Sequence, residues 1–208
     1  MGGATGFLWL RLRHQRTSAE LAHQALKQAW EPKITPHGLG VWGAFAGHFG
    51  LDTRELVFIV NHPRRGYDLP GVLADLPNSG VEVVEEINLI PTARPSNTLP
   101  LSRAGLYVHR LFEIEASHAD EFVQLSAAGW QTLENSDRYA SEPMGLFRES
   151  TSTRALIRMV LVTWYDSFAS WQESRNFPPG AAVNFQRRAE LTLGTIAYAT
   201  RLLPVEAG

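Results

Sequence analysis

The stretch Val108-His109-Arg110-Leu111 is the key to the architecture, because a similar stretch, Trp9-Leu10-Arg11-Leu12, stands earlier in the chain with its arginine 99 residues before the later one. Both stretches are short, rich in β-forming residues and followed by apolar residues at helical spacing. Self-similarity at a fixed period is typical of a chain built from structural repeats. The sequence therefore predicts two copies of one unit, each beginning with an arginine-bearing strand.

The elements that follow each of these strands match in kind and order. A helix is followed by a glycine-initiated strand, a buried β-branched strand, a second helix and a closing strand. In the first half these elements are expected at residues 18–30, 38–42, 55–60, 69–76 and 88–91. In the second half they are expected at 117–133, 144–147, 158–163, 167–175 and 201–204, with an extra helical stretch at 182–189. Ser18 or Thr17, Ser117 and the pair Asp166-Ser167 are the expected helix N-caps.

This order, βαββαβ repeated, predicts an α+β fold of tandem ferredoxin-like units. Residues 1–91 form the first unit, 92–104 a linker and 105–208 the second unit. One such unit has helices on only one face of its sheet, so the other face is apolar and must be buried. We expect the two sheets to pack together within the chain as a single dimeric-type α/β barrel.

Composition excludes several classes of protein. Of the 208 residues, 44% are hydrophobic and 19% charged, with a formal net charge of −2, so neither disorder nor nucleic-acid binding is expected. The chain lacks cysteine and any apolar run long enough to span a membrane, and its first residues do not read as a signal peptide. We expect a cytoplasmic protein. Seventeen arginines against two lysines are typical of a GC-rich, bacterial genome. Histidine spacing predicts no metal site, and no cofactor motif is present.

The second half resembles the NIPSNAP family. Residues 158–168, a hydrophobic strand followed by Trp164-Tyr165-Asp166-Ser167-Phe168, resemble the strand-to-helix signature of that family. The segments 145–148 and 107–112 resemble its second and first strands, whereas the first half has Asn61-His62-Pro63 in place of the signature. The resemblance implies a dimeric α/β-barrel fold, in a superfamily that includes cofactor-poor monooxygenases, haem-binding enzymes and non-enzymatic proteins.

The barrel lumen is the expected location of a site, and alternate strand residues would line it. Arg11 and Arg110 are candidates to hold an anionic ligand there, the alternative being that each pairs with a carboxylate. His109 is the best candidate for a general base, the alternative being a histidine satisfied within the core.

Four further residues complete the expected site. Tyr165 and His62 stand near corresponding strand ends, where loop-borne groups often act. Phe112 and Trp164 supply aromatic surface for a ligand. His109, Arg110 and Tyr165 are thus the catalytic candidates, with Arg11, His62, Phe112 and Trp164 as ligand-binding candidates.

Three functions remain open at this point. The barrel could bind or convert a small apolar, aromatic or carboxylate-bearing molecule in its lumen. It could instead be a non-catalytic structural or interaction protein, or it could bind haem through one histidine. Association into homo-oligomers is compatible with each, because the helix faces stay available.

Overall fold

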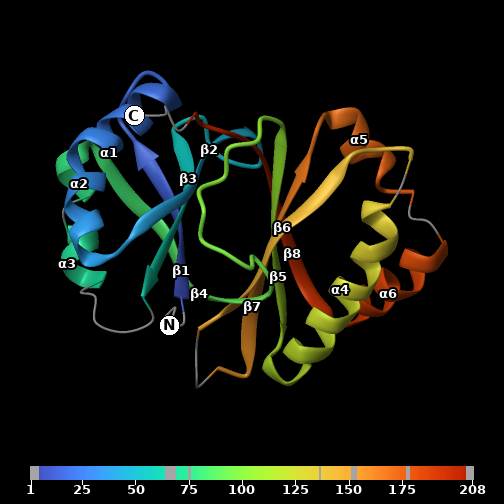
Figure 1. Ribbon diagram of the computed structural model, residues 1–208. Helices are drawn as coiled ribbons and strands as arrows, with labels where there is room; N and C mark the ends of the chain where they lie inside the picture. Colours follow the sequence, from blue (N-terminus) through green and yellow to red (C-terminus); the bar gives the residue numbers. More distant parts are fainter. Residues whose placement is uncertain are drawn as a thin grey trace. The chain divides into compact units, whose positions relative to one another are not determined.

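The computed structural model of the protein describes residues 5–63, 69–74, 76–135, 137–150, 154–176 and 179–204. Within these residues, eight strands and six α-helices follow the order βαββαβ twice (Figure 1). The strand order β1-β3-β2-β8-β5-β7-β6-β4 is that of a closed barrel, which confirms the expected α+β fold class. The chain divides into two compact units, and each is described by itself below.

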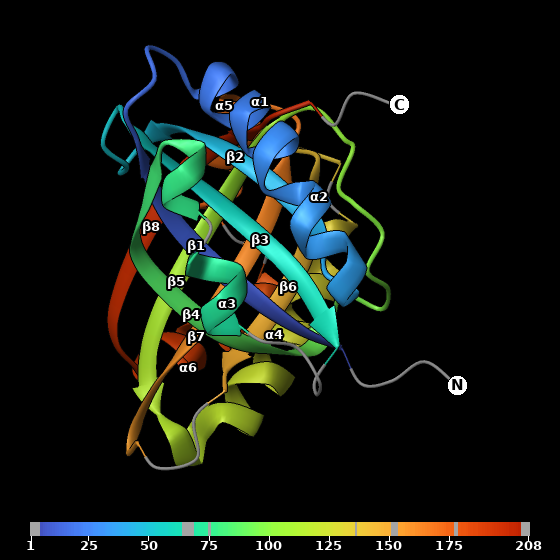
Figure 2. The same ribbon diagram turned by 90° about the vertical axis from the view of Figure 1, so that its left-hand side faces the viewer.

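The first unit comprises residues 1–90, 97–103 and 200–208. Its antiparallel sheet has the order β4-β1-β3-β2. The strands are β1 (Thr5–His14), β2 (Gly40–Phe49), β3 (Glu55–Pro63) and β4 (Val81–Arg94). The helices are α1 (Ala19–Ala29), α2 (Glu31–Ile34) and α3 (Leu69–Ala74). Figure 2 shows these helices lying over β1 and β3.

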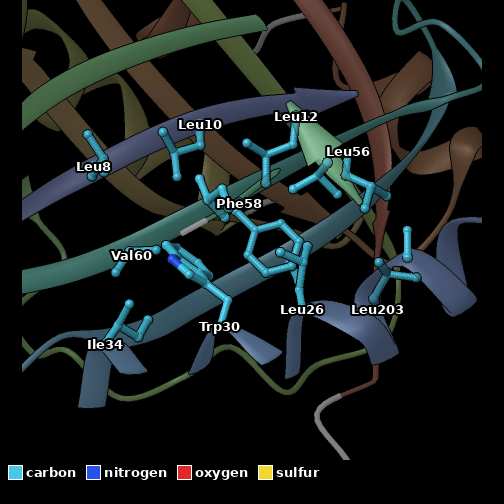
Figure 3. Packing of buried hydrophobic residues seen from close by; sticks show 14 of the residues in the cluster. Leu8, Leu10, Leu12, Leu26, Trp30, Ile34, Leu56, Phe58, Val60 and Leu203 are labelled. Atoms are coloured by element: carbon cyan, nitrogen blue, oxygen red, sulfur yellow. The ribbon is translucent and has the colours of Figure 1, made fainter. Parts of the chain in front are cut away.

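Apolar side chains make up most of the core of the first unit on the face that meets the helices. Strand residues alternate between faces, and β1 directs Leu8, Leu10 and Leu12 toward α1. There they pack with Trp30 and Phe58, and all five side chains are fully buried (Figure 3). The opposite face of β1 therefore carries Trp9, Arg11 and Arg13.

The second unit comprises residues 91–96 and 104–199. Its sheet has the order β8-β5-β7-β6. The strands are β5 (Leu106–Glu115), β6 (Ser141–Glu149), β7 (Leu156–Tyr165) and β8 (Thr192–Leu202). The helices are α4 (Ala119–Glu134), α5 (Phe168–Glu173) and α6 (Pro179–Glu190). Gly129 of α4 lets α6 approach closely, because a Cβ there would lie 2.5 Å from the Phe185 ring.

Most expected elements are present, with differences at their ends. The caps at Ser18 and Ser167 are confirmed, since each side chain accepts a hydrogen bond from a backbone N–H of the first turn. The cap at Ser117 is wrong, because that residue lies in a short 3-10 turn and α4 begins after His118. β4 continues past its expected end at Pro91 into the expected linker, and β8, of which only the end was expected, begins at Thr192.

Candidate functional site

A pocket of about 430 Å³ opens on the second unit. It lies on the helix-covered face of the sheet, because Phe112, one of its walls, also packs in the core beneath α4 and α6. Elements from four parts of the chain line it: β5, the segment after α5, helix α6 and the start of β8. The lining residues are Arg110, Phe112, Arg175, Phe185, Arg188, Ala189, Thr192, Leu193, Gly194 and Thr195.

Arg188 is fixed in the inner wall of the pocket. Only 7% of the residue is exposed, although it carries a guanidinium group. The guanidinium carbon lies 4.7 Å from the ring centre of Phe185 and 5.3 Å from that of Phe112. Its Nη1 donates a hydrogen bond of 3.1 Å to the hydroxyl of Ser126, which in turn donates to the Phe122 carbonyl at 2.8 Å. These contacts hold the cation by ring faces and a neutral hydroxyl.

Arg175 follows α5 and approaches the pocket from another side. Its Nη2 donates hydrogen bonds to the hydroxyl of Tyr165 at 3.3 Å and to that of Ser174 at 3.1 Å. Its guanidinium carbon also lies 5.7 Å from the centre of the Trp171 ring. Tyr165, at the end of β7, is thereby tied to the same group of charges.

Arg110 extends from the middle of β5 into the same pocket. Burial, followed by repulsion from Arg175, lowers the pKa of Arg110 to about 10, with Tyr165 acting in the opposite direction. Burial, followed by repulsion from Arg110 and Arg175, lowers the pKa of Arg188 to about 10 as well. The three guanidinium groups are therefore close enough to repel one another in a poorly solvated space.

None of the lining residues that the structure describes is acidic. Across the described part of the chain, no Asp or Glu forms an ion pair or hydrogen bond with Arg110 or Arg188, and no acidic residue lines the pocket. Other arginines of the protein are paired: Arg94 with Glu134 and Arg158 with Glu149, for example. The arrangement can therefore bind an anion, because buried guanidinium groups are stabilised by charge-assisted hydrogen bonds to one.

The structure brings together three of the seven residues expected at the site. Arg110 and Phe112 line the pocket, and Tyr165 contacts Arg175 beside it. His109 and Trp164 lie on the opposite face of the sheet, since they alternate with Arg110 and Tyr165 along their strands.

His109 is enclosed in that face. The residue is 0% exposed, and burial lowers its pKa to about 3. A general base works best with a pKa near the working pH, so this environment does not suit the expected role. The Trp164 indole donates a hydrogen bond of 2.9 Å to the Ala104 carbonyl, which fixes the start of β5.

Arg11 is not a counterpart of Arg110, contrary to the expectation that both enter one cavity. Arg11 points away from the helices of its unit, whereas Arg110 points toward those of its own. The helix-facing residues of β1 are Leu8, Leu10 and Leu12, and those of β5 include Phe112 and Ile114, so aligning Arg11 with Arg110 is one residue out of register and exchanges the two faces of the strand. Arg11 instead pairs with Glu55 at 3.7 Å and Glu85 at 3.4 Å, the alternative considered from the sequence.

His62 lies in the first unit, on the face of β3 that meets the helices. It is 6% exposed, and its Nδ1 lies 2.7 Å from the Pro63 carbonyl oxygen. Burial is the main cause that lowers its pKa. Gly6 makes room for the ring, because a Cβ at that position would lie 2.3 Å from the imidazole. His62 is not part of the arginine pocket.

Sequence reasoning missed Arg175 and Arg188. A signal for Arg188 was present, because Ala181, Phe185 and Arg188 fall on one face of a helix at spacings of four and three residues. All three are buried, so an arginine occupies a core position of α6. Arg175 has no comparable signal, since it stands in an irregular turn after a short helix.

The pocket does not fit haem. Haem iron needs an axial ligand, most often histidine, and no histidine is among the lining residues. His109 is enclosed on the far face of the sheet. Among the residues described by the structure, no three His, Asp or Glu side chains gather as a metal site would require. In the same described residues no helix is long and apolar enough to cross a membrane.

Comparison with known proteins supports the fold. No protein-family model matches the chain, and no curated protein sequence matches it. Solved structures do match the chain. One is a variant of chlorite dismutase from Candidatus Nitrospira defluvii, with a TM-score of 0.63 and 7% sequence identity. The match covers 98% of this chain and 93% of the chlorite dismutase chain. An anthrone oxidase-like protein has a TM-score of 0.60 at 15% identity, with 95% and 91% covered.

A heme-binding protein from Thermus thermophilus is similar over 100% of this chain and 94% of its own, with a TM-score of 0.57 and 12% identity. These structures belong to the dimeric α/β-barrel type. At such identities the likeness establishes the fold and leaves the chemistry to the residues of this chain.

Proposed function

We propose that the protein binds a small anionic molecule in the arginine pocket of its second unit, through Arg110, Arg175 and Arg188. The observation that carries the proposal is that Arg110 and Arg188 share a pocket with Arg175, and that among the residues the structure describes no carboxylate lines the pocket or pairs with Arg110 or Arg188. Burying a guanidinium group without an opposite charge is costly, so the arrangement of Arg110 and Arg188 is more readily explained by a ligand than by stability.

The first unit provides an internal comparison. In the middle of its first strand the residues that face the helices are Leu8, Leu10 and Leu12, which pack with Trp30 and Phe58 (Figure 3). The corresponding face of the second unit carries Arg110 on β5 and Arg188 on α6. Charged groups therefore stand in the second unit where the first strand of the other unit has leucines, which supports a role for them in binding a ligand.

Tyr165 is buried behind the pocket and helps to position one of its cations. Its oxygen accepts a hydrogen bond from Arg175, which holds that guanidinium group in place. Binding is the function that these groups support, and conversion of the ligand would require the phenol or a group on the ligand itself.

We propose in addition that the chain is related to the NIPSNAP proteins and that it associates into homo-oligomers. The relationship is supported by the Trp164-Tyr165-Asp166-Ser167 motif, whose tyrosine lies beside the pocket, and the association by the helix faces that a single chain leaves available. The pocket is on the helix-covered face of one sheet, and this differs from the lumen site expected from the sequence.

The proposal is tested by thermal unfolding with a panel of anions at low ionic strength. Benzoate, phosphate and sulfate should raise the melting temperature of the wild type in proportion to occupancy. The Arg188→Met variant should lose the response, whereas Arg13→Met, which removes an exposed arginine paired with Glu55, should keep it. Equal responses in all three proteins would show that the anions act elsewhere.

A further inference from the structure

The number of positive charges in the arginine pocket indicates how many negative charges the ligand carries, in addition to showing that the ligand is an anion. Arg110, Arg175 and Arg188 all line one pocket of about 430 Å³. Arg110 and Arg188 repel each other and have no carboxylate partner among the described residues, so a singly charged ligand would neutralise only one of them. A second negative charge at the same end of the ligand would satisfy the second guanidinium group at short range.

The remaining walls are mostly apolar, with Thr192 and Thr195 as the polar residues. Phe112 and Phe185 flank the guanidinium of Arg188, and Ala189 follows on the same helix. Leu193 of β8 stands at the rim with 60% of its surface exposed. An exposed leucine beside a charged pocket offers a surface for the uncharged part of a ligand.

We propose, building on the anion-binding function above, that the ligand is an amphipathic dianion whose doubly charged head group contacts the three arginines and whose apolar body lies against Phe185 and Leu193. Phosphate monoesters and vicinal dicarboxylates share this chemistry. Both present oxygen atoms on adjacent positions that can accept bidentate hydrogen bonds from guanidinium groups.

Two of the three arginines are held in place by other side chains, so the pocket is already arranged to receive the charged head group of a ligand. Arg188 is held by three phenylalanine rings and by Ser126, and Arg175 by Tyr165 and Ser174. Their positions are set before the ligand arrives, so little side-chain ordering remains to oppose binding. A site of this kind discriminates by charge and shape together.

Isothermal titration with a matched pair of ligands tests the inference. Phenyl phosphate and benzenesulfonate have the same ring and a tetrahedral head, but near pH 8 the first is a dianion and the second a monoanion. Phenyl phosphate should bind at least about tenfold more tightly, corresponding to one additional close charge contact. The affinity for phthalate, a dicarboxylate, compared with that for benzoate, a monocarboxylate, tests the same charge difference with carboxylates. The affinity for inorganic phosphate compared with that for phenyl phosphate measures the contribution of the ring.

Three further measurements separate the contribution of the second charge and of the apolar body from general electrostatic attraction. Lowering the pH through about 6 protonates phenyl phosphate, so its advantage over benzenesulfonate should shrink. Arg175→Met should reduce the affinity for phenyl phosphate far more than that for benzenesulfonate. Leu193→Ser should weaken phenyl phosphate while leaving inorganic phosphate unchanged.

The outcomes distinguish the two levels of the proposal. Equal affinity for phosphate and sulfonate, or for phthalate and benzoate, would overturn the dianion inference while leaving anion binding intact. If inorganic phosphate binds as tightly as phenyl phosphate, the inference that an apolar body of the ligand lies against Phe185 and Leu193 is wrong. No binding of any ligand by the folded wild type would overturn the proposed function itself.

Discussion

Replacing Arg110 by leucine should stabilise the ligand-free protein and abolish its response to anions. The pKa of Arg110 falls from 12.5 to about 10, so its charged form is disfavoured by up to about 3 kcal/mol in the folded state. Part of the side chain reaches solvent at the pocket, and the net gain on removal is smaller, about 1–2 kcal/mol. For a chain of this length that corresponds to a rise in melting temperature of about 2–8 °C.

The matched control is Arg11→Leu, the arginine of the other repeat. Arg11 lies 3.7 Å from Glu55, whose side chain is 4% exposed, so its removal leaves a buried carboxylate with fewer partners. We expect a loss of about 1–2 kcal/mol, opposite in sign to the effect at Arg110. Urea unfolding measures both, with and without phenyl phosphate. Destabilisation by Arg110→Leu in the absence of ligand would be evidence against a strained ligand site, because it would mean that Arg110 stabilises the fold.

Three more perturbations have outcomes that the structure determines. Burial holds the pKa of His109 at about 3 in the folded protein against 6.5 when unfolded, so the stability it contributes is present above pH 6.5 and is lost as the pH falls toward 3. Between about pH 6.5 and 4.5 the wild type should lose about 3 kcal/mol more than His109→Leu in urea titrations, and parallel curves would contradict this. Gly129→Ala places a Cβ 2.5 Å from Phe185 and should cost about 1–3 kcal/mol while weakening anion binding, whereas an unchanged binding isotherm would show that Phe185 is not a wall of the occupied site. Anion-induced stabilisation should be constant from about pH 7 to 9 and decline above the pKa of Arg188, about 10, because deprotonation removes the charge; a response that persists well above that pH would argue against arginine as the binding group.

The fold was largely predictable, because it depends on strong and repeated patterns. Leu8, Leu10 and Leu12 alternate along β1 as a half-buried strand requires, and Ser18 and Ser167 cap helices where a serine precedes apolar spacing. The strand β8 was found only at its end. Its first residues include small and exposed ones such as Gly194 and Thr195, which give little β signal.

The site was predictable only in part, for a physical reason. Arg110, Phe112 and Tyr165 come from strands whose alternation places them together once the face is known. The face itself was misjudged, because aligning Arg11 with Arg110 ignored the two-residue period of a strand. Arg175 and Arg188 come from segments more than sixty residues after Arg110, and no local pattern links an irregular turn to a helix face.

A crystal structure of the protein grown with phenyl phosphate would show whether the arginine pocket is a ligand site. We predict a phosphate head in the pocket, with its oxygens within hydrogen-bonding distance of Arg110, Arg175 and Arg188, and the phenyl ring against Phe185. An empty pocket at saturating ligand, or a carboxylate of the chain itself lying among the three guanidinium groups, would contradict anion binding at this site.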